Sequence, residues 1–275
     1  MFYFKRSVIM PAIIMLFWCK LTFAAAYVPD RGHGMAIIGA NAYAAQTEFQ
    51  KNKSTTSFGE DGKFTKRELY YYLAHAISND WAIIASGAIL NKLSYENDFD
   101  EKNFTGPGDQ YLGARYFHKK DQWGAGALQL GVSFPAYSNA ANPAPGNRQS
   151  DLEIRYLRDH FQIMGPSFLS WEIAYRYRSS SPSDQLRADL NFGKNLKQWL
   201  PMVHVNYIKG LRNQSAQDSS VNPNTASDFD LVKAGISIAY RYSGQDSVQL
   251  GFMEDILGRN TGKGRGIFLA WWKGY

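Results

Sequence analysis

Residues 168–178 are Phe-Leu-Ser-Trp-Glu-Ile-Ala-Tyr-Arg-Tyr-Arg, and large apolar or aromatic side chains occupy every second position from Leu169 to Tyr177. Small or charged side chains stand between them, among them Glu172 and Arg176. Because successive side chains of a β-strand point to opposite faces, this spacing predicts a strand with one apolar and one polar wall. Residues 186–192 and 232–242 repeat the pattern.

The same period of two continues along the chain from residue 35, and no sustained apolar stripe with helical spacing interrupts it. The segments that follow it are 35–50, 64–77, 81–93, 108–118, 123–134, 149–161, 166–179, 183–193, 200–212, 229–242, 246–257 and 265–275. We therefore predict an all-β chain of about twelve strands.

The connectors between these strands alternate in length. Those at 51–63, 94–107, 135–148 and 213–228 are long, and those at 78–80, 119–122 and 243–245 are short, with 180–182 as a compact exception. An even strand count with tight turns at one end and long loops at the other is typical of an outer-membrane barrel. The pattern predicts a transmembrane antiparallel up-and-down β-barrel with both termini in the periplasm.

The amino terminus resembles a secretory signal peptide. Lys5 and Arg6 precede an apolar stretch at 8–18, and small residues follow where a peptidase would cleave, after Ala24 or Ala26. We expect residues 1–26 to be removed and residues 27–275 to form the barrel domain. The net charge then falls from +6 to +3, and the single cysteine is lost with the leader. A nucleic-acid partner is not expected.

Aromatic residues are abundant, with 17 Phe, 17 Tyr and 7 Trp. Many stand near predicted strand ends, which suits the aromatic girdles of a membrane barrel. The candidates are Tyr70, Tyr71, Tyr72, Trp81, Trp123, Trp171, Trp199, Trp271 and Trp272. The last strand ends with alternating Ile267, Leu269, Trp271 and Tyr275, which resembles the sorting signal of bacterial outer-membrane proteins. Expected partners are outer-membrane lipid, lipopolysaccharide and the barrel-assembly machinery.

The polar faces of the predicted strands supply the candidate lumen-lining residues. They are Glu68, Arg115, Glu153, Arg155, Glu172, Arg176, Arg178, Arg187, Asp189, His204, Lys233, Arg241 and Asp255. Seven are basic and five are acidic, with His204 counted as neutral. Two interpretations remain open: a self-neutralising ion-pair network that fills a narrow interior, or a polar passage that slightly prefers anionic or hydrogen-bonding solutes.

Enzymatic barrels have recognisable spacings that this chain lacks. None of His33, His75, His118, His160 and His204 has Ser two residues later, as a serine–histidine lipid hydrolase of this membrane would require. Asp159 and His160 are adjacent, so a strand would point them to opposite faces. No cluster of metal ligands or cofactor motif is evident, and we predict no catalytic residues. The glycine-rich segment 259–265 is expected to be a loop, with possible contact to lipopolysaccharide phosphates.

Residues 106–117, Gly-Pro-Gly-Asp-Gln-Tyr-Leu-Gly-Ala-Arg-Tyr-Phe, are followed after a short turn by 123–135, Trp-Gly-Ala-Gly-Ala-Leu-Gln-Leu-Gly-Val-Ser-Phe-Pro. This hairpin resembles the G-x-G-D-x-x-L-G-x-(K/R)-Y hairpin of a bacterial family known as the MetA-pathway of phenol degradation proteins, or outer-membrane transporters. The close match covers about 30 residues. The resemblance implies a barrel that moves small compounds, often hydrophobic or aromatic.

Three functional classes follow from this sequence. The first is a passive channel for a small solute, the second is a structural or adhesive surface barrel with a plugged lumen, and the third is a lipid-acting enzyme. The enzyme is the least favoured of the three, because the chain lacks the serine–histidine and aspartate–histidine spacings of known barrel enzymes.

Overall fold

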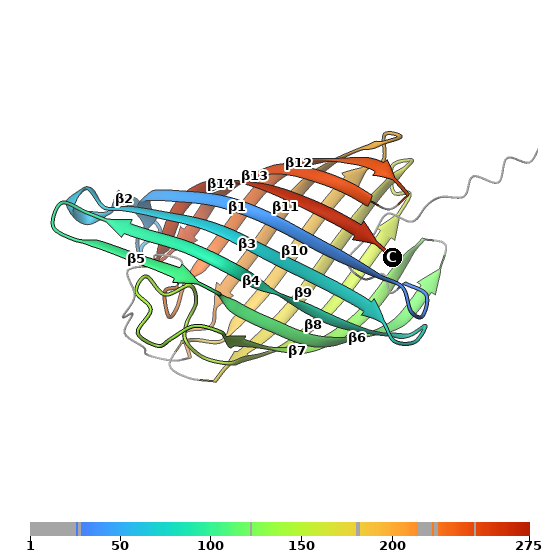
Figure 1. Cartoon of the computed structure of the whole chain (residues 1–275), viewed down its shortest axis with the longest axis horizontal. Helices are drawn as coiled ribbons and strands as arrows, with labels where there is room; N and C mark the ends of the chain where they lie inside the picture. The colour runs from blue at the N-terminus through green and yellow to red at the C-terminus, as the bar shows by residue number, and fades with distance from the viewer. Residues whose placement is uncertain are drawn as a thin grey trace, which may run out of the picture.

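The computed structural model describes residues 26, 29–121, 123–179, 182–213, 222, 225–244 and 246–275. Twelve antiparallel strands form a closed barrel, as the sequence predicts (Figure 1). They are β1 (Gly34–Phe49), β3 (Lys63–Ala76), β4 (Trp81–Glu96), β6 (Asp109–Asp121), β7 (Gly124–Pro135), β8 (Asp151–Phe161), β9 (Ser167–Arg178), β10 (Gln185–Lys194), β11 (Trp199–Gly210), β12 (Asp230–Ser243), β13 (Asp246–Arg259) and β14 (Thr261–Gly274).

Two short strands extend the wall beyond these twelve. β2 (Thr55–Ser57) pairs with the end of β1, and β5 (Glu101–Gly106) pairs with the end of β4. A single turn of 3₁₀ helix, η1, occupies Gly59–Asp61. Within the described residues, no helix is long and apolar enough to cross a membrane.

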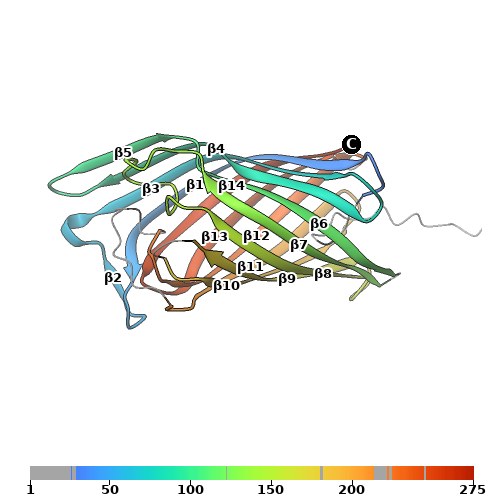
Figure 2. The same ribbon diagram turned by 90° about the horizontal axis from the view of Figure 1, so that it is seen from below.

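Each of the twelve long strands pairs with the next of the twelve along the chain. The first, β1, also pairs with the last, β14, from Met35↔Gly274 to Phe49↔Thr261. This last ladder closes the sheet and leaves no free edge, which is the condition for a β-structure to lie in lipid. The start of β1 and the end of β14 lie at the same end of the barrel, which we call the terminal end (Figure 2). The described parts of the connectors 50–62, 97–108, 136–150, 179–184 and 211–229 gather at the opposite end, the loop end.

One predicted connector is wrong. We expected 259–265 to be a loop, but β13 runs to Arg259, β14 begins at Thr261, and only Asn260 separates them. Asn260 adopts a left-handed backbone with φ 54°, which an asparagine tolerates in a tight turn. The glycines of this segment serve packing instead, because a Cβ at Gly264 would lie 2.4 Å from the Ala44 carbonyl oxygen on the paired strand. Glycine composition alone therefore misled the sequence interpretation.

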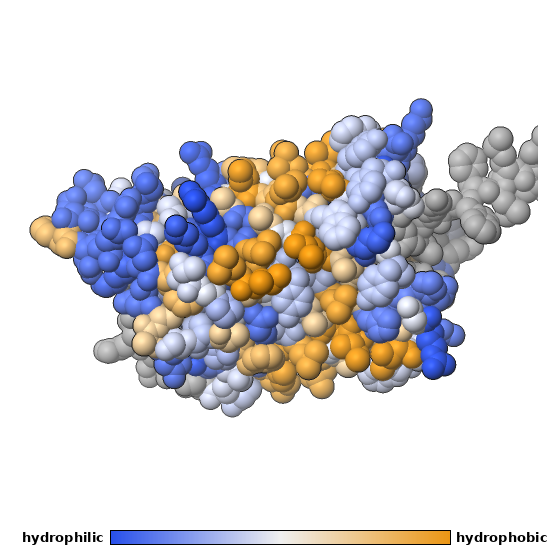
Figure 3. All heavy atoms as spheres, viewed as in Figure 1, coloured by the Kyte–Doolittle hydropathy of each residue, from blue (hydrophilic) through white to orange (hydrophobic). Residues whose placement is uncertain are grey.

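The outer wall is apolar around its middle and hydrophilic at the loop end (Figure 3). Outward side chains such as Ile173, Ile236 and Ile267 are more than half exposed, which suits a wall that faces lipid. Aromatic side chains face outward near the terminal end; they are Trp81, Tyr116, Trp123, Trp199, Tyr240, Tyr242 and Trp271. Trp81 packs against Tyr116 with the rings tilted and 5.0 Å between their centroids, and Trp199 packs against Tyr240 in the same way at 4.7 Å.

Not every predicted girdle residue belongs to this outer set. Tyr70, Tyr72 and Trp272 line cavities inside the barrel. Each lies one position away from an outward neighbour, so the alternation that makes Trp271 face lipid turns Trp272 inward. Proximity to a strand end predicts the depth of an aromatic residue but not its face.

The predicted leader, residues 1–26, lies outside the described residues except for Ala26. The Ala26 backbone N–H donates to the Asp159 carboxylate at 2.7 Å. Ala26 is fully buried in a small apolar cluster that includes Ile84, Phe117 and Leu157. This cluster narrows the barrel interior near the terminal end.

We predict that Gly264→Ala destabilises the barrel by about 1–3 kcal/mol, the usual cost of forcing an extra carbon into a packed site. The reason is the 2.4 Å approach of the new Cβ to the β1 backbone in the closing ladder. The measurement is urea unfolding of refolded protein, followed by tryptophan fluorescence. Gly59→Ala is the control, since no atom lies within 4 Å of its added Cβ. Equal midpoints for the two variants would contradict this account of the closing ladder.

Candidate functional site inside the barrel

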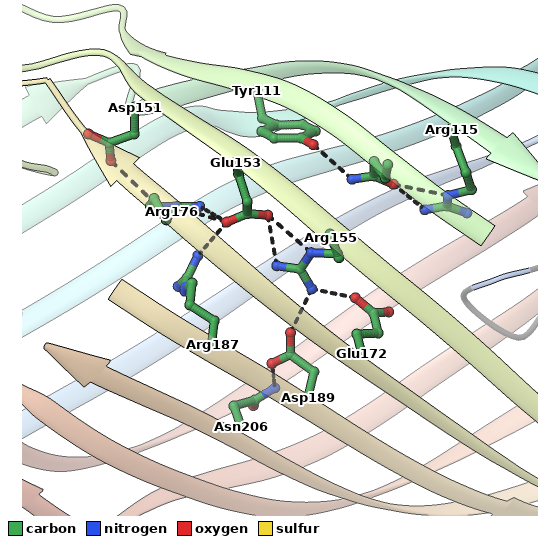
Figure 4. Close-up of polar contacts among 11 residues, drawn as sticks. Tyr111, Arg115, Asp151, Glu153, Arg155, Glu172, Arg176, Arg187, Asp189 and Asn206 are labelled. Atoms are coloured by element: carbon green, nitrogen blue, oxygen red, sulfur yellow. Dashed lines mark hydrogen bonds and ion pairs between the residues drawn. The ribbon is translucent and has the colours of Figure 1, made fainter. Parts of the chain in front are cut away.

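Six charged side chains from three adjacent strands meet on the inner wall (Figure 4). We call them the arginine–carboxylate cluster: Glu153 and Arg155 from β8, Glu172 and Arg176 from β9, and Arg187 and Asp189 from β10. Three are arginines and three are carboxylates, so the cluster is neutral as a whole. Their side chains share one face because the two residues on each strand are an even number of positions apart, two on β8 and β10 and four on β9.

Arg155 is the centre of the cluster. Glu172 and Asp189 lie directly opposite each other on paired strands, a like-charge pair that would be destabilising alone. Arg155 Nη1 contacts Glu172 Oε2 and lies 2.7 Å from Asp189 Oδ2. Arg155 Nη2 lies 2.9 Å from Glu153 Oε1. One guanidinium thus compensates three carboxylates, which the fixed fork of arginine donors allows.

Glu153 connects Arg155 to two further arginines. Arg176 Nε donates to Glu153 Oε2 at 2.9 Å, and Arg187 Nη1 lies 3.5 Å from the same oxygen. Asn206 of β11 donates to Asp189 Oδ1 at 2.7 Å and extends the network to a fourth strand. The Glu153 side chain is only 3% exposed, so this carboxylate has exchanged water for arginine donors.

Arg115 belongs to a separate polar group built from β3, β6 and β7. Its Nε and Nη2 donate to Gln129 Oε1 at 2.9 and 2.8 Å, and Nη2 also donates to the Tyr72 hydroxyl at 3.1 Å. Gln129 in turn donates to the Tyr111 hydroxyl at 2.8 Å. The Gln129 and Tyr72 oxygens that accept from Arg115 are neutral, unlike the carboxylates around Arg155.

Other predicted lumen residues form local contacts elsewhere on the inner wall. His204 lies between Asn191 Oδ1 and Ser237 Oγ, each 2.7 Å from a ring nitrogen. Lys233 Nζ is 3.4 Å from Asp255 Oδ1.

Glu68 accepts from Asn41 at 2.9 Å and pairs with Lys66 at 2.5 Å. The structure therefore distributes polar groups around the circumference and does not gather them into one constellation.

Three predicted residues lie apart from the two cavities or, in the case of Arg178, at the edge of the second one. Arg178 is 2% exposed and lies under the loop end, where its Nη1 donates to the Ser183 carbonyl at 3.4 Å. Arg241 lies near the terminal end, donates to Asn195 Oδ1 at 3.4 Å, and lines neither large cavity described below. Asp255 is fully buried and does not line them either.

Two cavities occupy the interior. The first, of about 510 Å³, lies toward the terminal end, and its apolar lining includes Ile37, Tyr72, Ile84, Phe168, Met202 and Trp272. The second, of about 660 Å³, lies toward the loop end, and its polar lining includes Asn41, Lys66, Glu68, Arg187, Asn206 and Lys233. Asp109, Arg176, Asn191 and His204 line both. The two cavities therefore meet at the level of the arginine–carboxylate cluster.

Connectors fold inward over the second cavity. Pro145, Gly146 and Asn147 of the 136–150 connector line it. Ala144 is fully buried, and its carbonyl accepts from Asn222 Nδ2 at 2.8 Å. The mouth at the loop end is thus narrowed by ordered segments of two connectors.

Sequence reasoning missed the uncharged lumen partners that complete these contacts: Asn41, Tyr43, Tyr72, Tyr111, Gln129, Asn191, Asn206 and Ser237. Alternation does place Gln129, Asn191 and Asn206 on the polar face, so the signal was present. It was passed over because only ionisable groups were collected as candidates.

No protein-family model and no curated protein matches this sequence. Solved structures do resemble it. An outer membrane channel from Pseudomonas putida F1 aligns with a TM-score of 0.73 and 11% identity, over 91% of this chain and 98% of that one. The translocator domain of the autotransporter NalP from Neisseria meningitidis aligns with a TM-score of 0.51 and 10% identity, over 89% and 90%. The chain has the fold of bacterial outer-membrane β-barrels.

We predict that Arg155→Gln lowers the free energy of unfolding by about 3 kcal/mol, because it leaves three inward carboxylates short of their shared cation. Adding Glu172→Gln should recover part of the loss by removing one facing acid. Urea unfolding of the single and double variants measures both effects. Arg241→Gln is the charge-matched control, with an expected change within about 0.5 kcal/mol. A double variant less stable than Arg155→Gln would refute the role given to Arg155.

Asp184 in the 179–184 connector gives a pH prediction. Its carboxylate accepts from the Arg178 N–H at 2.8 Å, the Tyr175 hydroxyl at 2.7 Å and Asn213 Nδ2 at 2.7 Å. Burial acts to raise the pKa of Asp184, but these hydrogen bonds outweigh it and hold the pKa below its usual value.

A lowered folded-state pKa contributes stability above the unfolded value of about 4, and that contribution is lost as pH falls through the folded pKa. The drop in unfolding midpoint from pH 6 to pH 3 should therefore be smaller in Asp184→Asn than in the parent protein. An identical drop would assign the acid sensitivity to other groups.

Proposed function

We propose that this protein is a passive channel for small solutes. The observation that carries the proposal is the pair of cavities that meet at the arginine–carboxylate cluster, inside a wall whose outer face suits lipid. A solute that moves along the barrel must pass this level and exchange hydration for the hydrogen bonds that Arg155, Arg176 and Arg187 offer. Rings of charged side chains set selectivity in this way.

The chemistry of the two cavities supports a solute with an apolar part and an anionic or hydrogen-bonding group. Aromatic and aliphatic side chains line the first cavity, and Arg176 borders both. This fits the family resemblance, which implies hydrophobic or aromatic cargo. Because the cluster carries equal positive and negative charge, we expect weak charge preference and small conductance rather than a wide pore.

A second candidate function is a surface barrel with an occluded lumen. The buried contact between Ala144 and Asn222 favours it, because this contact narrows the lumen at the loop end. The two functions differ in one measurable property, the passage of ions or solutes.

We predict discrete single-channel events when the refolded mature chain is inserted into planar bilayers in KCl. Arg176→Gln with Arg187→Gln should shift the reversal potential in a KCl gradient toward cation preference, because two inward positive charges are lost. Lys51→Gln with Lys53→Gln removes the same charge from an exposed connector and should leave the potential unchanged.

Absence of both single-channel events and solute flux in liposomes would overturn the channel proposal and favour the occluded barrel. If the Arg176→Gln, Arg187→Gln variant gives single-channel events with an unchanged reversal potential, the protein is a channel but these two arginines do not set its selectivity.

A further inference from the structure

The outer wall carries an unexpected group of cations on the half of the barrel nearer the loop end. Arg67 on β3, Lys92 on β4 and Arg265 on β14 are all exposed. Their neighbours in the chain show that they face outward: Glu68 and Lys66 pair inside, while Asn91 and Leu93 are buried. Charged side chains on the lipid face are costly in the middle of the bilayer and tolerated near its surface.

Arg67 and Lys92 lie directly opposite each other in the β3–β4 ladder. Like charges at such a cross-strand position repel, so the fold places two cations where they destabilise each other. Within the part of the chain that the structure describes, neither has an acidic partner at ion-pair distance. Arg265 has the acidic Glu254 as its cross-strand neighbour, which offsets part of its charge.

Between Arg67 and Arg265 the wall is hollow. Ala42 pairs with Arg67 on one side and with Ile267 on the other, and Ala44 pairs with Arg265. These small side chains form the floor of a groove of about 360 Å³, and Arg67, Arg265, Phe252 and Ile267 also line it. The groove thus presents two guanidinium groups next to an apolar surface (Figure 3 shows the apolar middle of this face and its hydrophilic loop end).

We propose that this groove binds a phosphorylated lipid of the surrounding membrane, with the phosphate between Arg67 and Arg265 and an acyl chain against Phe252 and Ile267. Arginine forms bidentate hydrogen bonds with phosphate, and a phosphate here would relieve the repulsion between Arg67 and Lys92. The adjacent apolar side chains favour a lipid over a free anion, because only a lipid covers both surfaces at once. The site lies outside the barrel and does not depend on transport.

The test is native mass spectrometry of the full mature barrel in detergent, titrated with diphosphorylated lipid A. We expect a single saturable lipid on the parent protein. Arg67→Gln with Arg265→Gln should weaken binding roughly tenfold or more. Lys51→Gln with Lys53→Gln loses the same charge from a connector and should bind as the parent does. Single-channel events of both variants should match those of the parent, which separates this site from the lumen.

Two further arms use the parent protein alone, so the test does not depend on the folding of a variant. Fully dephosphorylated lipid A should bind at least about tenfold more weakly, and inorganic phosphate should not displace the bound lipid. Equal binding of the dephosphorylated lipid, displacement by inorganic phosphate, or equal losses in the two double variants would each overturn the proposal.

Discussion

The closing ladder between β1 and β14 is the constraint on which the rest of this structure depends. A backbone in lipid has no water to satisfy its N–H and C=O groups, so a sheet must pair its first strand with its last. Here that ladder runs from Met35↔Gly274 to Phe49↔Thr261. It requires β14 to run along almost all of β1, which is why a glycine-rich segment that looks like a loop becomes strand. The small residues Ala44 and Gly264 let the two backbones meet.

Closure also decides where charge can go. Once the wall is complete, every strand has one face toward lipid and one toward the interior, and most strand charges lie on the inner face. There the carboxylates cannot remain unpaired, so Arg155 is surrounded by Glu153, Glu172 and Asp189. The same pairing that makes these charges tolerable also holds their side chains at the level where the two cavities meet. In the proposed channel, the contacts that stabilise the cluster would also set its selectivity.

The exceptions to this separation are informative. Arg67, Lys92 and Arg265 point outward near the loop end, where the wall passes from apolar to hydrophilic surroundings. Charges on the lipid face are not needed for folding, and a cross-strand pair of cations opposes it. In the proposed lipid site, Arg67 and Arg265 would bind a phosphate beside the small-residue groove, a role that the interior cluster does not share.

Alternation along segments such as 168–178 was enough to predict twelve strands, their order and the face of most residues, because a period of two is a local property of the backbone. Connector lengths predicted which ends of the strands lie together. Which acid meets which arginine could not be predicted, since the contacts of Arg155 are set by the register of β8, β9 and β10 and by the reach of its side chain. The inward turn of Tyr70, Tyr72 and Trp272, the cavities and the outer groove were likewise decided only by the closed barrel. They arise from side chains brought together across strands, whose spacing in the sequence carries no trace of that contact.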